Sequence, residues 1–232
     1  MQFMLMPNVF LGIVMLKYKI KRVIAGFVSV IPLSVLRIFL YRLCGYKFGT
    51  GCKVGFGVMI AVDQFAAGNN CCIRKFTTFI GPICVNIGNN VMIGRKNTFE
   101  CGESAAYPGV AHMGYERRLI VHDGALINEG HIFDLLGKIE IGKETWIAGF
   151  SSQFLTHGAG VMDRNIYIGD NCFVGSAVRF TPGSCVGSNN IVAMGAVVTK
   201  KFSKNNHIIG GVPARLLRQR DENDSFSFKK TW

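Results

Sequence analysis

The stretch that decides the fold is IGDNCFVGSAVRFTPGSCVGSNNIVAMGAVVTK, residues 168–200. An apolar residue recurs in it at every sixth position: Ile168, Val174, Phe180, Val186, Val192 and Val198. A spacing of six fits neither an α-helix nor the two-residue alternation of a strand. It does fit a triangular solenoid, in which each hexad is one short strand and one corner and three hexads make one coil. The leading apolar residue of each hexad is then expected to point inward.

Residues suited to tight corners and to a narrow interior occupy the other fixed places of the repeat. Residues that tolerate a left-handed backbone cluster where corners are expected: Gly169, Asp170, Asn171, Gly175, Gly183, Gly187, Asn189 and Asn190. Small residues follow four places after the leading apolar residue, at Cys172, Val178, Ser184 and Ala196. The sequence therefore predicts an all-β solenoid.

This stretch resembles the hexapeptide-repeat acyltransferases, a family of left-handed parallel β-helices. The most specific similarity is in MGAVVTK, residues 194–200, and IIGGVPARLLR, residues 208–218, which look like the family's closing coil and acyl-CoA-binding exit. The resemblance covers most of residues 48–218 and is strongest from Ile141 onward. It implies a left-handed parallel β-helix that transfers an acyl group. A β-helix with a purely structural role is the alternative.

The composition of the chain limits the kinds of partner that it is expected to bind. The chain has 232 residues, which suits one solenoid domain with appendages, and a formal net charge of +12. This charge favours an anionic partner: the phosphates of coenzyme A, a nucleotide- or lipid-linked sugar, or an acidic membrane surface. No aromatic-bearing nucleic-acid motif gathers the basic residues, so no nucleic acid is predicted. Cys52, Cys71 and Cys172 take small-residue places and are interpreted as buried thiols in a reducing compartment, the cytoplasm.

Three parts are predicted along the chain. Residues 1–45 are apolar and basic, residues 46–218 form the β-helix, and residues 219–232 form a polar tail that is either mobile or a short closing helix. The hexad period is lost at 103–118 and at 156–165, which predicts two loops that leave the coil. Such loops often carry specificity.

The N-terminal part is predicted to be helical. Its apolar runs, 9–16 and 23–36, flank a basic segment, and each is shorter than the ~20 residues of a membrane-spanning helix. No basic region precedes the first run, so a cleaved signal peptide is not expected. Two interpretations stay open. The helices either lie on the inner face of the cytoplasmic membrane, with Arg37 and Arg42 adding to a basic face, or cap the first coil or a neighbouring subunit.

His157 is the strongest catalytic candidate. It stands in SQFLTHGAG at the edge of a coil, with an irregular loop behind it, so its imidazole is expected to face a cleft. By resemblance, a histidine followed by a loop and an IGDN coil is the general base of the family. A sugar hydroxyl is a poor nucleophile, and imidazole can take its proton near neutral pH as it attacks a thioester.

Other site residues follow from the resemblance. Ser176 matches the position whose backbone N–H and side chain lie beside the acyl group, which makes it the expected oxyanion donor; an ordinary corner serine is the alternative. His131, Asp134 and Asn128 lie about one coil before His157, where relatives place polar residues that contact substrate. His131 or Asp134 could also orient His157.

The coenzyme A site is expected at the closing coil. Resemblance points to Met194, Thr199, Lys200, Arg215 and Arg218, where lysine and arginine can meet phosphates, and also to Ser176 beside the acyl group. Two departures stand here: Met194 replaces the usual small residue, and KFSKNN replaces an acidic, proline-rich turn. No pair of histidines five apart occurs, as a carbonic anhydrase on this fold would require, so no metal is predicted.

The sequence therefore predicts an acetyl-CoA-dependent O-acetyltransferase that acts on a sugar in bacterial surface polysaccharide synthesis. By resemblance it is a homotrimer with active sites between neighbouring solenoids. An N-acetyltransferase of a nucleotide-linked amino sugar and a non-catalytic β-helix assembly subunit remain as alternatives.

Overall fold

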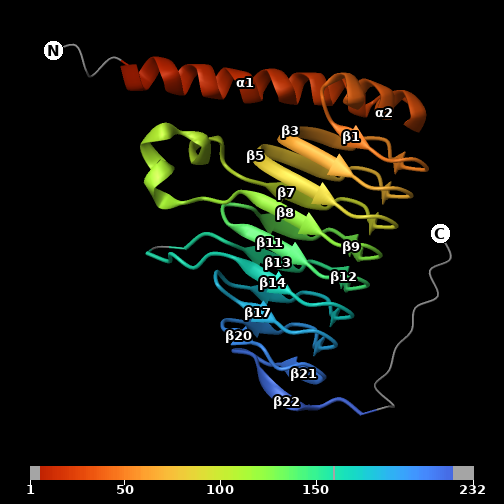
Figure 1. The fold of residues 1–232 in the computed structure, drawn as a ribbon, viewed down its shortest axis with the longest axis vertical. Coiled ribbons are helices and arrows are strands. Elements are labelled where there is room, and N and C mark those ends of the chain that lie inside the picture. The colour runs from red at the N-terminus through yellow and green to blue at the C-terminus, as the bar shows by residue number, and fades with distance from the viewer. Residues whose placement is uncertain (1–5, 159, 222–232) are drawn as a thin grey trace.

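The computed structural model describes residues 6–158 and 160–221, which form a β-helix capped at one end by two helices (Figure 1). The helices α1 (Met6–Ser29) and α2 (Ser34–Leu43) lie across the end of the solenoid, and the coils follow one another away from them. The predicted fold class, an all-β solenoid of parallel hexads with an N-terminal helical segment, is confirmed.

Three rows of parallel strands run along the solenoid, one on each face. The first row consists of β2 (Lys53–Val54), β4 (Cys72–Ile73), β6 (Met92–Ile93), β9 (Leu126–Glu129), β12 (Trp146–Phe150), β15 (Phe173–Val174), β18 (Ile191–Val192), β21 (His207–Gly210) and the antiparallel β22 (Arg215–Gln219). The second contains β7 (Thr98–Glu100), β10 (Ile132–Asp134), β13 (Gln153–Leu155), β16 (Arg179–Phe180) and β19 (Val197–Val198). The third contains β1 (Lys47–Phe48), β8 (Arg118–Val121), β11 (Lys138–Ile141), β14 (Ile166–Ile168), β17 (Cys185–Val186) and β20 (Lys201–Phe202). The long strands β3 (Met59–Ala67) and β5 (Thr78–Ile87) run through both of these rows.

The hexad places behave as predicted. The leading residues of the hexads have no exposed surface: Ile168, Val174, Phe180, Val186, Val192 and Val198. Neighbouring coils are joined by backbone hydrogen bonds, such as the one that the Gly175 amide donates to the Val192 carbonyl at 2.9 Å. Two equivalent corners place Asn171 and Asn189 in the left-handed region, at φ 52° and 58°.

Phenylalanines fill the interior of the second row. Phe79, Phe99, Phe133, Phe154 and Phe180 stack in order, with centroid separations of 4.6, 4.4, 4.4 and 4.9 Å and interplanar angles of 15° or less. Adjacent parallel strands lie about 4.8 Å apart, so equivalent side chains meet ring on ring. The stack holds β10 and β13 in register, and these strands lead to the candidate site.

The cysteines of the repeat are thiols. All eight cysteines of the chain lie in the described residues and are free. Cys71 and Cys172 are buried, as predicted, while Cys52 is half-buried. Burial raises the pKa of Cys71 and of Cys172 to about 11, because it disfavours the thiolate. A neutral buried thiol is a poor nucleophile.

The helix α1 caps the first coil through an inner face that is partly polar and partly apolar, with Ala25 and Val28 buried. Lys17 Nζ and the Tyr18 hydroxyl each donate to the Asp63 carboxylate at 2.8 Å, and Tyr18 is buried. Arg22 forms an ion pair with Glu103 at 2.9 Å, which joins the helix to the first inserted loop. The predicted cap on the first coil is therefore confirmed for this face of α1. None of the helices within residues 6–158 and 160–221 is long and apolar enough to cross a membrane.

The prediction that Arg37 adds to an exposed basic face is wrong. Arg37 is 3% exposed and points toward the solenoid, where Nε and Nη2 donate to the Val54 carbonyl at 3.1 and 2.6 Å. Nη1 donates to the Ile31 carbonyl. Burial lowers the pKa of this guanidinium, and the carbonyls satisfy its donors. Arg42 is exposed, as predicted.

The two breaks in the hexad period correspond to irregular segments. The first contains the short 3₁₀ helices Glu103–Ala106 and Pro108–Met113, and leaves the solenoid on the side below α1 (Figure 1). The second lies between β13 and β14 and is described except for residue 159. The strand β22 ends at Gln219, the first residue of the predicted tail, and the tail from residue 222 lies outside the described residues.

Candidate functional site

His157 lies on an open edge of the solenoid. It follows β13, at the corner between the second and third rows, where the second inserted loop leaves the coil. Its side chain is 66% exposed. The imidazole is thus outside the packed interior. Neither of the two hollows described below is lined by His157, so the cleft expected beside it stays a prediction.

Asp134 holds this histidine in place from the preceding coil. Asp134 pairs in register with Leu155, so its carboxylate lies beside the chain that follows β13. One oxygen, Oδ2, accepts from the backbone amides of Thr156 and His157 at 3.0 Å each and lies 2.6 Å from His157 Nδ1. The Thr156 hydroxyl donates to the Asp134 carbonyl at 2.6 Å. Both the backbone and the ring of His157 are thus fixed to one carboxylate.

The contact between Asp134 Oδ2 and His157 Nδ1 determines which ring nitrogen can accept a proton. An ionised carboxylate can only accept, so Nδ1 of the neutral imidazole carries the hydrogen. Nε2 is then the nitrogen with a free lone pair, and it is on the solvent side of an exposed ring. The arrangement can accept a proton from a molecule bound at this edge.

His131 is not part of this edge, and its predicted contact with substrate is wrong. It has no exposed surface, and its Nδ1 accepts the Ser152 amide at 3.1 Å. Burial lowers its pKa to about 4, so the ring is neutral. His131 stands four places after the inward-pointing Ile127, which is the small interior place of the hexad. Counting the repeat at this coil would have placed it inside.

Asn128 and Ser176 lie at a different corner of the coil. Asn128 is at the end of β9 and Ser176 follows β15, so both lie between the first and second rows. The Asn128 carbonyl accepts from Asn97 Nδ2 at 2.5 Å. The Ser176 carbonyl accepts the Gly195 amide at 2.9 Å. The described chain therefore does not bring either residue to His157.

The two inserted loops meet beside the His157 edge. The guanidinium of Arg164 lies 5.0 Å from the ring centroid of Tyr115, and its Nη1 donates to the Met113 carbonyl at 3.2 Å. Asn165 Nδ2 donates to Glu116 Oε1. These contacts join residues that are about fifty positions apart in sequence, and they make one wall from both loops.

A basic hollow of about 540 Å³ lies near the closing coil. It is lined by Lys200, Lys201, Phe202, Ser203, Lys204, Arg215 and Leu216. Two of the six predicted coenzyme residues, Lys200 and Arg215, are therefore brought together. Lys200 is at the same corner as His157, two coils further along, and Lys201 forms an ion pair with Asp163 of the second loop at 2.7 Å. Lys200 and Lys201 thus connect this hollow to the His157 edge.

The other predicted coenzyme residues do not line the hollow. Met194 is 77% exposed and follows β18, at the corner that also holds Ser176. Thr199 precedes Lys200 and is exposed, while Arg218 lies on β22 and has Asp221 at 3.8 Å. Among the described residues, no group of three or more histidine, cysteine or acidic side chains could hold a metal ion.

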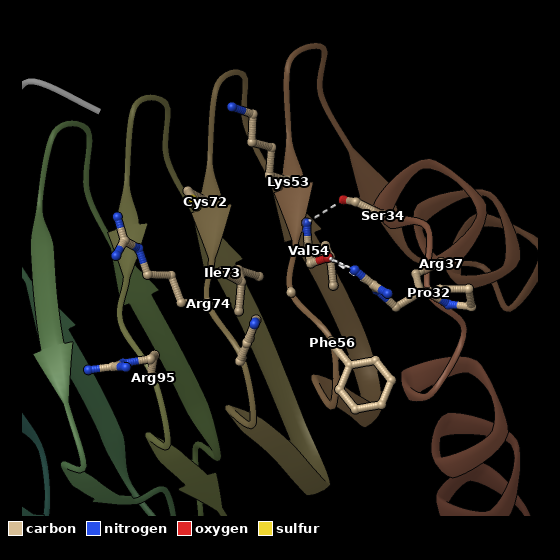
Figure 2. Close-up of a pocket in the computed structure, with 12 residues that line it drawn as sticks. Pro32, Ser34, Arg37, Lys53, Val54, Phe56, Cys72, Ile73, Arg74 and Arg95 are labelled. Atoms are coloured by element: carbon tan, nitrogen blue, oxygen red, sulfur yellow. Dashed lines mark hydrogen bonds between the residues drawn. The ribbon is translucent and has the colours of Figure 1, made fainter.

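A second cleft of about 540 Å³ lies at the opposite end of the solenoid. Figure 2 shows it between α2 and the first row, with Lys53, Arg74 and Arg95 on successive coils. Lys75 also lines it. On the α2 side, the Ser34 hydroxyl accepts the Val54 amide at 2.9 Å. This cleft was not predicted from the sequence, because its basic residues come from separate hexads.

Comparison with known proteins gives short sequence matches and broad structural ones. No family model matches the chain. A galactoside O-acetyltransferase of Escherichia coli (strain K12) is 34% identical over 67 residues, which are 29% of this chain. The match spans 32% of that relative, about a third of its length.

Two solved structures resemble the fold over most of its length. A hexapeptide-repeat acetyltransferase from Vibrio cholerae has a TM-score of 0.48 and 18% identity, covering 90% of this chain and 93% of that one. The polysialic acid O-acetyltransferase OatWY has a TM-score of 0.44 and 20% identity, covering 80% of this chain and 92% of its own. Each of these three proteins is named as an acetyltransferase, and the Vibrio cholerae protein is named as one that contains hexapeptide repeats.

Proposed function

We propose that this protein is an acetyl-CoA-dependent O-acetyltransferase that acts on a sugar hydroxyl in bacterial surface polysaccharide synthesis. The observation that carries the proposal is the pairing of Asp134 with His157 at 2.6 Å on an exposed edge. A histidine with one nitrogen fixed by a carboxylate and the other free is arranged to act as a general base. The sequence similarity to a galactoside O-acetyltransferase supports the reaction class.

His157 Nε2 takes the proton of the acceptor hydroxyl as that oxygen attacks the acetyl carbonyl. The attack gives a tetrahedral oxyanion, and the backbone N–H of Ser176 is assigned to stabilise it. When the carbon–sulfur bond breaks, the protonated His157 returns its proton to the departing thiolate. Asp134 is a positioning residue in this scheme rather than the sugar contact expected from the sequence, since its Oδ2 is occupied by Thr156 and His157.

The scheme requires more than one copy of the chain. Ser176 and His157 lie at different corners of the coil, so within one solenoid the Ser176 amide does not face the His157 ring. A homotrimer would bring these corners together across an interface. The outer side of the first row supports such packing, because the residue before the inward aliphatic is apolar and only partly buried in four coils: Trp146, Phe173, Ile191 and Ile208.

The homotrimer is tested by light scattering. The expected mass is three times that of the 25.5 kDa chain, at concentrations where the enzyme turns over. A monomer that is active at low concentration would refute both the trimer and the shared site.

Acetyl-CoA is assigned to the basic hollow at the closing coil. Lys200 and Arg215 line it, and phosphates prefer such groups. Met194 and Thr199 on the closing coil, with Arg218 on β22, are assigned to the rest of the coenzyme, where exposed backbone can pair with the pantetheine arm.

Replacing both Lys200 and Arg215 by alanine should raise the KM for acetyl-CoA by roughly tenfold or more, because charge-assisted hydrogen bonds to the phosphates are lost. Acetyl-pantetheine lacks the nucleotide phosphates, so its KM should not change. Lys143→Ala, at an exposed corner away from the hollow, is the control. An equal rise in KM for both thioesters would show that Lys200 and Arg215 do not bind the phosphates of the coenzyme.

Calorimetry with acetyl-CoA tests the function itself. Binding, followed by turnover with a panel of sugar acceptors, is the expected result, and product mass separates O- from N-acetylation. If the wild-type protein binds no acetyl-CoA, the acyltransferase proposal fails.

The acceptor is assigned to the wall formed by the two inserted loops, which adjoins His157. The enzyme is assigned to the cytoplasm, where acetyl-CoA is made.

A further inference from the structure

The outer face of the two N-terminal helices is apolar and uncovered. An exposed stripe is formed by Leu16, Ile20, Val23 and Phe27 on α1 and by Val30 directly after it, which recur at alternating spacings of four and three. Each is more than half exposed, and Phe27 is 73% exposed. The described part of the chain therefore leaves a continuous apolar stripe in contact with solvent.

The short helix α2 continues this surface. Val35, Leu36, Phe39 and Leu43 are exposed on it, Val35 at 81% and Leu43 at 70%, and the connecting Leu33 is 65% exposed. Together with the α1 stripe they form what we call the apolar cap face. Both helices lie across the end of the solenoid (Figure 1), and the side chains of the apolar cap face are exposed to solvent rather than packed on the coils.

These helices expose more apolar surface than an ordinary surface helix does. Their inner face mixes polar and apolar side chains: Tyr18 and Lys21 bind Asp63, and the buried Arg37 binds backbone carbonyls of residues 31 and 54. Ala25, Val28 and Ile38 are buried beside them. A surface helix of a water-soluble domain normally buries its apolar stripe and exposes its polar one. A contiguous exposed apolar patch of this kind marks an interaction surface.

The charge around the face indicates the occupant. The first 62 residues contain eight basic residues and no acidic one; Asp63 is the first acid in the chain. Lys19 is exposed beside the α1 stripe, one turn before Val23, and Arg42 is exposed on α2. Two copies of this face in contact would oppose like charges, whereas anionic lipid headgroups would neutralise them.

We propose that the apolar cap face docks on an acidic membrane surface, with the solenoid standing away from the bilayer. The apolar side chains enter the interface between headgroups and acyl chains, and Lys19 and Arg42 meet the headgroups. The basic cleft below α2 lies about one helix diameter, ~10 Å, further from the lipid, which is close to one Debye length at physiological salt. Lys53, Arg74 and Lys75 in that cleft therefore contribute less than Lys19 does.

The test is co-sedimentation of the full chain with vesicles. The wild type should pellet with vesicles of equal parts phosphatidylcholine and phosphatidylglycerol, less with phosphatidylcholine alone, and less as salt is raised. Phe27→Glu combined with Leu43→Glu should lower partitioning by on the order of tenfold or more, since two buried apolar groups are lost. Lys19→Glu should lower it several-fold on acidic vesicles only.

Matched controls lie on other parts of the solenoid. Leu217→Glu changes a 60% exposed leucine on β22, and Lys143→Glu changes an exposed lysine at a corner in the middle of the solenoid; both should pellet like the wild type. Phe27 and Leu43 face solvent, so thermal unfolding of the double variant should match the wild type.

Three results would overturn the proposal. The wild type could remain in the supernatant with acidic vesicles, or the double variant and Lys19→Glu could both pellet as the wild type does. Light scattering could instead show that the wild type forms a larger assembly than the double variant does, in which case a second copy of the chain covers the face. None of these results depends on acetyl-CoA, so a failure here is distinct from a failure of the proposed enzyme activity.

Discussion

His157→Ala is expected to lower kcat by about 10²- to 10⁴-fold, the range typical for the loss of a general base. Acetyl-CoA binding, measured by calorimetry, should be unchanged, because the basic hollow around Lys200 is two coils away. The side chain is 66% exposed, so its removal leaves no cavity, and thermal unfolding should be close to that of the wild type. Steady-state kinetics with acetyl-CoA and a sugar acceptor gives kcat and KM separately.

The chain offers a matched control for this substitution. His122 also pairs with a carboxylate, through Nε2 to Glu140 at 2.9 Å, but it lies after β8 at a different corner. His122→Ala should leave kcat unchanged. Asp134→Asn should give a loss in kcat no larger than that of His157→Ala, since the base remains but its tautomer is no longer fixed. Full activity of His157→Ala would remove the proposed mechanism.

Phe133→Ala is expected to destabilise the protein by about 3–5 kcal/mol, the usual cost of truncating a fully buried phenylalanine. Phe133 has no exposed surface, and its ring centroid lies 4.4 Å from the ring centroids of both Phe99 and Phe154 in the stack. In a solenoid each coil contacts only its neighbours, so a gap here weakens the junction between coils on either side. Urea unfolding followed by circular dichroism measures the loss.

Phe133→Ala should also disturb the position of the Asp134–His157 pair and so lower kcat. Phe133 precedes Asp134, and Phe154 lies two residues before Thr156, so the stack sets the register of the strands that carry the Asp134–His157 pair. Phe150→Ala, at a 64% exposed phenylalanine on β12, is the control and should change the free energy of unfolding by no more than about 0.5 kcal/mol. Equal stability of Phe133→Ala and Phe150→Ala would show that the stack contributes nothing to the fold.

The hexad repeat made the fold predictable from sequence. Inward aliphatics at every sixth position, with Asn171 and Asn189 at corners, specify short parallel strands and leave few other arrangements. Loss of the period located both inserted loops, and His157 stood out because it follows a coil edge. These features are local, so their spacing is visible along the chain.

What the tertiary structure alone decided was contact between coils and the direction of each side chain. Asp134 and His157 meet because parallel pairing places Asp134 beside Leu155, and His131 turns inward because it occupies the interior place of its hexad. Lys200 and Arg215 meet only once the chain has turned back through β22. The N-terminal helices are apolar over much of their surface, so the pattern could not show which stripe packs; Asp63, which binds Lys17 and Tyr18, decides it.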